Sequence, residues 1–256
     1  MAAGDICGDR PSSCRATAHL IRSSSPDAVL TLGDNQYESG SLAEYRASYD
    51  KAWGRFKTIT FPTAGNHEWK TPNAQGFRDY FGLRRTWYAF RLGAWRLIAL
   101  DGTCSSNGGC GPGSPQYAWL RRELASHPRR CTLAFWHEPR FSSGTTHGSS
   151  TDVGSLWELL FQAGAELVLN GHEHNYERFA AQDPNGAADV DGIVEIVAGT
   201  GGRDDGDYPF GPPIANSVVR LSGVGVVRLR LTHLGWSERF LRPGGSVADS
   251  ASGRCV

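Results

Sequence analysis

Short apolar runs alternate along the chain with segments of helical periodicity, and several of the runs end in a polar cluster. The stretches "DAVLTLGDNQY", "TITFPTAGNHEW", "CTLAFWHEPRF" and "ELVLNGHEH" each begin with a run typical of a buried β-strand. Helices are predicted at "SCRATAHLIRSSSP", "SPQYAWLRRELASHP" and "DVGSLWELLFQAG". Ser114 is a typical helix cap, Pro115 suits a first turn, and Gly164 suits a helix end.

The remaining pattern is dominated by strands. The stretch "TWYAFRLGAWRLIALD" predicts a hairpin that turns at residues 92–94, and strands alone are predicted after residue 190. This order predicts an α/β fold (α+β by some schemes), a four-layer α-β-β-α sandwich of two mixed sheets flanked by helices. No linker rich in proline or serine divides the chain, so residues 1–256 are expected to form a single domain.

The charge composition excludes some classes of partner. Lysine plus arginine and aspartate plus glutamate number 26 each in 256 residues, so no net charge favours a nucleic-acid scaffold or a membrane surface. No apolar run reaches the roughly 20 residues of a membrane span, and no signal-peptide pattern precedes Asp5. We therefore expect the mature part of a protein that acts without a membrane span.

The six cysteines indicate an oxidising compartment. They lie mostly in loops rich in glycine, serine and proline, and none has Cys-x-x-Cys spacing, which argues against a structural zinc site. We predict three disulfides in a secreted or periplasmic protein: Cys7–Cys14, Cys104–Cys110 and Cys131–Cys255. The alternative is a cytosolic protein with six reduced thiols.

Metal-capable residues follow each of five predicted strands. They are Asp5, Asp34, Asn66 with His67, His137, and the pair His172 and His174. Each has an ordinary alternative as a turn residue or a buried histidine. The carboxyl ends of strands converge in α/β sheets, however, and residues two apart on an extended chain face the same side. These side chains are therefore expected to form one metal site, whereas His19, His127 and His233 are interpreted as structural.

The ordered motifs resemble those of a known superfamily. The series Gly-Asp, Gly-Asp-x-x-Tyr, Gly-Asn-His-Glu, a strand-end histidine and Gly-His-x-His-x-Tyr-Glu-Arg resembles the calcineurin-like metallophosphoesterases. The pattern is most similar to the purple acid phosphatases, and it runs from about Asp5 to Gly202. Cys7 stands where most of the superfamily has a histidine, and Tyr37 stands where the purple acid branch has its tyrosine ligand.

The resemblance implies two metal ions with separate ligand sets. The first, Fe(III), would be bound by Asp5, Tyr37 and His174, because a phenolate stabilises a hard trivalent ion. The second, Zn(II), Fe(II) or Mn(II), would be bound by Asn66, His137 and His172. Asp34 would bridge the two ions. His67 would contact the substrate phosphate, His147 would assist the departing alcohol, and Glu68 and Arg178 would support the histidine loops.

The implied function is a secreted, metal-dependent phosphoesterase. It would hydrolyse monoesters of small phosphorylated substrates through a dinuclear centre and a metal-bound hydroxide. A phosphodiesterase or nucleotide hydrolase of the same superfamily remains an alternative, as does a binding module that has lost catalysis. A metallo-β-lactamase-type hydrolase is disfavoured because "HEHNYE" lacks the Asp-His pair that follows in that class. The sequence leaves the oligomeric state open.

Overall fold

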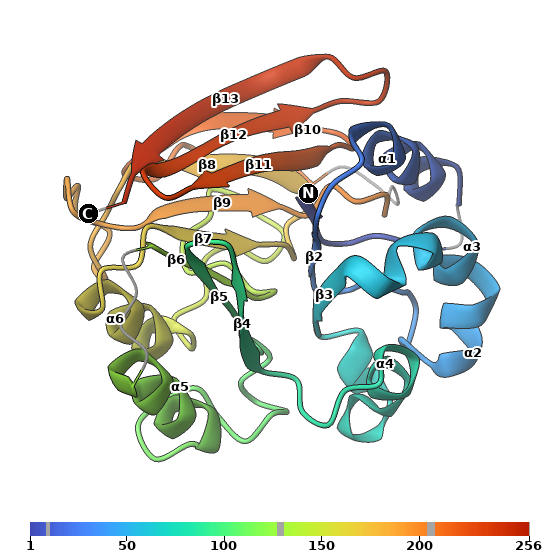
Figure 1. Cartoon of the computed structure of the whole chain (residues 1–256), viewed down its shortest axis with the longest axis horizontal. Coiled ribbons are helices and arrows are strands. Elements are labelled where there is room, and N and C mark those ends of the chain that lie inside the picture. Colours follow the sequence, from blue (N-terminus) through green and yellow to red (C-terminus); the bar gives the residue numbers. More distant parts are fainter. Residues whose placement is uncertain (9–10, 127–130, 204–207, 256) are drawn as a thin grey trace.

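Two mixed β-sheets pack face to face between two groups of helices in the computed structural model of the chain (Figure 1). The structure describes all residues except 9–10, 127–130, 204–207 and 256. The first sheet has the order β13-β12-β11-β1-β2-β3, with strands Val247–Arg254, Gly235–Leu241, Val226–Thr232, Ala2–Ala3, Val29–Leu32 and Thr60–Thr63. The second has the order β10-β8-β9-β7-β6-β5-β4, with strands Ser217–Ser222, Asn175–Phe179, Val194–Ala198, Leu167–Asn170, Cys131–Phe135, Trp95–Ala99 and Tyr88–Leu92.

The helices lie outside the sheets, as the predicted four-layer sandwich requires (Figure 1). The first sheet is flanked by α1 (Pro11–Ser24), α2 (Leu42–Glu44), α3 (Asp50–Ala52) and α4 (Gln75–Phe81). A π-helical segment, Tyr45–Tyr49, joins α2 to α3, and 3-10 segments span Gly54–Ile59, Glu68–Lys70 and Pro72–Ala74. The second sheet is flanked by α5 (Pro115–Ser126) and α6 (Gly154–Gln162). The predicted fold class is therefore confirmed.

Alternation along the strands divides the apolar residues among three cores. In β2, Val29 faces the helices on the first sheet, whereas Leu30 faces the second sheet. In β7, Leu167 packs between the sheets, and its neighbour Val168 faces α5 and α6. Successive strand side chains point to opposite faces, so strands covered on both sides are apolar throughout. This explains the continuous apolar runs of the sequence.

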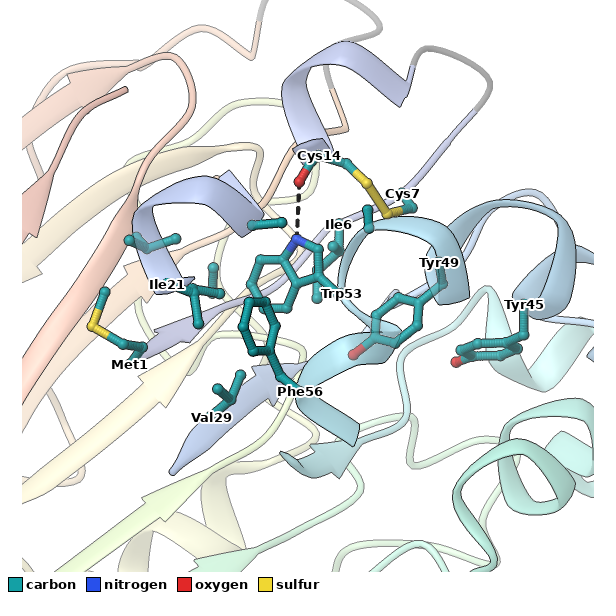
Figure 2. Packing of buried hydrophobic residues seen from close by; sticks show 14 of the residues in the cluster. Met1, Ile6, Cys7, Cys14, Ile21, Val29, Tyr45, Tyr49, Trp53 and Phe56 are labelled. Carbon is teal, nitrogen blue, oxygen red and sulfur yellow. Dashed lines mark hydrogen bonds between the residues drawn. A yellow bond between two sulfur atoms is a disulfide. The ribbon is translucent and has the colours of Figure 1, made fainter. Parts of the chain in front are cut away.

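Trp53 is at the centre of the core between α1 and the first sheet (Figure 2). Its indole N–H donates to the carbonyl oxygen of Cys14 at 3.1 Å, which ties the helical segments to α1. Phe56 and Ile21 pack around the same ring in Figure 2. A buried tryptophan both fills a large volume and uses its polar N–H in this position.

The three predicted disulfides are all formed. Cys7–Cys14 and Cys104–Cys110 close short loops, with sequence separations of 7 and 6 residues. Cys131–Cys255, with a separation of 124 residues, links the start of β6 to the residue after β13 and so joins the two sheets. Among the described residues, no helix has the length and apolar character needed to cross a bilayer.

Two strands and the helical segments between residues 42 and 81 differ from the prediction. β8 and β13 were not predicted, because polar residues interrupt their apolar alternation. His233 lies in the turn between β11 and β12, and His127 lies outside the described residues. The run of residues 217–232 divides between the sheets, since β10 pairs with β8 and β11 pairs with β1 and β12.

Candidate metal centre

The ends of five strands from both sheets meet at one rim of the sandwich. In the first sheet β1, β2 and β3 are parallel neighbours, and in the second β6 and β7 are parallel neighbours. The chain turns sharply after three of these strands, because Asp5, Asp34 and His172 have φ angles of 58°, 46° and 73°. Such left-handed conformations are unfavourable for residues other than glycine and are typical of functional sites.

The first group of predicted ligands forms a tight triangle. The Tyr37 hydroxyl lies 2.7 Å from Asp5 Oδ1 and 3.1 Å from His174 Nε2. His174 Nε2 lies 3.2 Å from the same carboxylate oxygen. The other oxygen of Asp5, Oδ2, accepts from the backbone N–H of His172 at 2.8 Å. Three donors from three loops therefore converge on one point.

The second group is arranged around His137. Its Nδ1 lies 2.8 Å from the carbonyl oxygen of Leu32 and donates its N–H there, so Nε2 is the nitrogen that faces the other ligands. That Nε2 lies 3.1 Å from His172 Nδ1 and 3.3 Å from Asp34 Oδ2. Asn66 follows β3, and its Oδ1 is buried with no hydrogen-bond partner among the described residues. An orphaned acceptor of this kind requires an explanation.

The charges of the cluster are unbalanced in a way that favours cations. Burial opposes ionisation of Asp5 and Asp34, but neighbouring histidines lower the pKa of each carboxyl. Burial also opposes the imidazolium form of His137, yet these two carboxylates raise its pKa well above the ordinary value. Burial and the charge of His137 lower the pKa of His172 to about 3. The negative charge of the two buried carboxylates is thus balanced by a proton on His137, and bound cations could balance it instead.

Tyr37 illustrates the same point. Burial and the carboxylates of Asp34 and Asp5 raise the pKa of its phenol well above the usual range, so the protonated hydroxyl donates to Asp5. Only a strongly charged cation at this point would reverse that preference and stabilise a phenolate.

The donor set fits metal ions. Asp5, Asp34 and His137 place ligand atoms within 4.8 Å of one another, and all three residues are buried. The orphaned Asn66 oxygen adds one neutral donor on one side, and His137 Nε2 adds another once a cation displaces its proton. Oxygen-rich ligands on the Tyr37 side suit a hard ion, and mixed nitrogen and oxygen ligands on the other suit a divalent transition metal.

The two predicted catalytic histidines lie beside the ligand groups. His67 Nδ1 is 2.7 Å from the carbonyl oxygen of Glu38 and 3.0 Å from Lys70 Nζ, and Nε2 is 3.9 Å from Asp34 Oδ2. The His147 ring stacks on His172 with centroids 4.0 Å apart. Burial lowers the pKa of His147, which shifts its protonated range toward acidic pH. Direct contacts thus join eight of the nine predicted site residues, and Asn66 lies in the loop of residues 65–67, which borders Asp34 and His137.

Comparison with known proteins agrees with this arrangement. The sequence profile of the calcineurin-like phosphoesterase family matches residues 1–176, which includes every predicted ligand. The chain belongs to this family. Membership implies a dinuclear metal centre, and the clustered donors above are where this calcineurin-like phosphoesterase would hold it.

Individual relatives place the chain more closely. It is 30% identical over 227 residues to purple acid phosphatase 15 of Arabidopsis thaliana, covering 73% of the chain and 42% of the relative. The chain spans about half the length of the curated relatives it matches. The fold is shared with a purple acid phosphatase from yellow lupin seeds, with a TM-score of 0.78 and 18% identity over 98% of this chain and 52% of that one. It is also shared with GAP50, the anchor in the inner membrane complex of Plasmodium, with a TM-score of 0.79 and 19% identity over 100% and 88%.

Sequence reasoning missed two side chains that border the centre of this calcineurin-like phosphoesterase. The Arg203 guanidinium lies over the Tyr37 ring at 4.4 Å, and the Tyr208 ring stacks on His174 at 3.8 Å. Both follow β9, whose end was not included among the predicted site positions. One signal was present in "AGTGG", because a Cβ at Gly199 would lie 2.7 Å from Asp5 Oδ2. This close approach marks the glycine-rich loop as part of the site.

The predicted supporting residues have different partners from those expected. Glu68 bonds to the backbone of the Asp34 and Asn66 loops rather than to the histidine loops. Arg178 pairs with Asp249 at 2.7 Å and so connects β8 to β13. Arg178 therefore supports the sheets and not the ligand histidines directly.

Proposed function

We propose that this chain is a metal-dependent phosphatase that hydrolyses monoesters of small phosphorylated substrates. The observation that supports it is the clustering, at five strand ends, of seven candidate ligands that include two buried carboxylates. We also propose that residues 1–256 form one domain, because no linker rich in proline or serine divides them, and the three disulfides support an exported protein, secreted or periplasmic.

We assign the ligands in two sets. Asp5, Tyr37 and His174 hold Fe(III), because a carboxylate and a phenolate are hard oxygen donors. The neutral donors Asn66, His137 and His172 leave the second position less negative, which suits Zn(II), Fe(II) or Mn(II). Asp34 lies between the sets. When bound, two such ions supply Lewis acidity toward the phosphoryl group and lower the pKa of water.

The chain's own residues then orient the substrate and deliver a proton. His67 presents Nε2 on the side of Asp34, where a phosphoryl oxygen can accept a hydrogen bond from its protonated form. His147 lies over His172 at the exposed edge of the centre, where a departing alcohol oxygen leaves. Its imidazolium donates a proton to that oxygen as the P–O bond breaks, and the neutral ring recovers the proton from solvent. Fixed groups hold the ester in one orientation for attack.

Activity on matched esters, with metal content measured on the same sample, tests this proposal. We expect about two bound metal ions per chain and faster hydrolysis of phosphate monoesters than of diesters. Asp34→Asn should lose both metal and activity, whereas Asp101→Asn, at a buried aspartate outside the ligand sets, should keep the metal. Faster diester cleavage would instead support the phosphodiesterase alternative.

A binding module remains the second candidate. It is motivated by the shared fold with GAP50, which is described as an anchor. A chain that binds no metal, and that added iron, zinc or manganese does not activate, would support that candidate and contradict ours.

A further inference from the structure

Buried glutamates hold the segment of residues 140–148 by its backbone. Glu195 accepts from the N–H groups of residues 140 and 141 at 2.8 and 3.1 Å. Glu177 accepts from the N–H of residue 143 at 2.7 Å. Glu173 accepts from the N–H groups of residues 147 and 148, both at 2.7 Å. A loop that carries His147 is thus fastened at successive points to the second sheet and the loop after β7.

Glu173 occupies a special position among these three. It lies between His172 and His174 in the sequence, and its side chain is fully buried. Its Oε1 receives both hydrogen bonds, while Oε2 has no hydrogen-bond partner among the described residues. Charge-assisted hydrogen bonds to a buried carboxylate are stronger than neutral ones.

Gly144 lies directly against the same carboxylate. A Cβ at this glycine would lie 2.3 Å from the carboxyl carbon of Glu173, so no larger residue fits without displacing the carboxylate. The turn of residues 144–148 therefore contacts the Glu173 carboxylate at both of its ends. The hydrogen bonds to Glu173 and the close approach of Gly144 both restrict the Glu173 side chain to one position.

We propose that Glu173 is a positioning residue that sets His147 over the site of the departing oxygen. The short run that contains two predicted metal ligands also anchors the backbone of the predicted proton donor. The stacking of His147 on His172 is then fixed by the hydrogen bond from the His147 backbone N–H to Glu173 as well as by the contact of the two rings. This inference rests on the proposed phosphatase function, because it assigns His147 its role there.

The test compares an alkyl phosphate with p-nitrophenyl phosphate. An alkoxide needs a proton to leave and a nitrophenolate hardly does, so loss of a positioned donor slows the alkyl ester selectively. Glu173→Met keeps the length and removes the acceptor, and it should lower alkyl ester hydrolysis about tenfold more than aryl ester hydrolysis. Glu173→Gln keeps an oxygen at the Oε1 position and should restore most of the difference.

Two further variants protect the test from a simple folding defect. Gly144→Ala leaves Glu173 in the sequence but displaces its carboxylate, so it should reproduce the selective loss and decides the matter if Glu173→Met does not fold. Glu195→Met removes a matched buried carboxylate from the start of the same segment and should leave the ratio of the two rates unchanged. In a His147→Ala background, Glu173→Met should add no further selectivity, because coupled residues are not additive.

The outcomes separate the two levels of inference. A wild-type protein inactive on both esters contradicts the proposed function. An active wild-type protein whose Glu173→Met and Gly144→Ala variants lose both activities equally, or whose Glu195→Met variant shows the same selective loss, overturns the positioning role alone.

Discussion

Glu68 connects the two loops that present Asp34 and Asn66, and its replacement should disconnect them. Its Oε1 accepts from the backbone N–H groups of Asn35 and Gln36 at 2.9 and 3.2 Å and from the Tyr45 hydroxyl at 2.9 Å. Its Oε2 accepts from the N–H of residue 65 at 2.8 Å. The side chain is fully buried, and burial and the charge of Asp34 raise its pKa to about 8, against the effect of these donors.

The magnitude follows from the four donors. Glu68→Ala leaves three buried N–H groups and one hydroxyl without a partner, and each orphaned group costs at least about 1 kcal/mol. We therefore expect a loss of about 4 kcal/mol in the free energy of unfolding. Glu68→Gln keeps one oxygen for the three Oε1 donors and turns an NH₂ group toward the N–H of residue 65, so it should cost about 1–2 kcal/mol. Tyr45→Phe removes one donor and serves as the matched control at about 1 kcal/mol.

Urea unfolding of the four proteins at one pH measures these differences, and metal content measured under native conditions shows their effect on the site. The expected stability order is wild type, then Tyr45→Phe and Glu68→Gln, then Glu68→Ala. Metal affinity should fall in both Glu68 variants and not in Tyr45→Phe, because only Glu68 joins the two loops. The reasoning is refuted if Glu68→Ala unfolds within about 1 kcal/mol of wild type and retains its metal.

Three further outcomes are expected. Replacing Cys131 and Cys255 together by serine should lower the free energy of unfolding by about 4–5 kcal/mol, since this crosslink closes a loop of 124 residues; an unchanged urea midpoint would contradict this. Burial raises the pKa of Asp101 to about 7, so its stabilising effect is complete below about pH 4 and is lost as pH rises through 7. Asp101→Asn should therefore gain stability relative to wild type between pH 5 and pH 8, by at most about 3 kcal/mol, and an equal difference at both pH values would exclude the explanation. The oxidised, iron-loaded protein should be violet or pink, and Tyr37→Phe should abolish that absorption band if the phenolate binds iron.

Local patterns were enough to predict most elements of this chain. Strands buried on both faces need continuous apolar runs, so β2, β6 and β7 could be predicted from the sequence alone. β13 was invisible for the opposite reason: one face is exposed, and its residues are small and polar. It is held by pairing with β12 and by the contact of Asp249 with Arg178, neither of which is local.

The sequence by itself determined most of the strands along the chain, the polar residues after five of them, and cysteine positions compatible with the three observed disulfides. These features depend on periodicity and on the chemistry of single residues, and both can be recognised within a short stretch of sequence. Only the tertiary structure decided which side chains from other segments border the site. Arg203 lies over the Tyr37 ring, Tyr208 stacks on His174, and Glu173 accepts from the backbone N–H of His147. No pattern in the sequence links the segments that make these contacts. Their loops meet at one rim because the two sheets pack together, which no local preference of the chain determines.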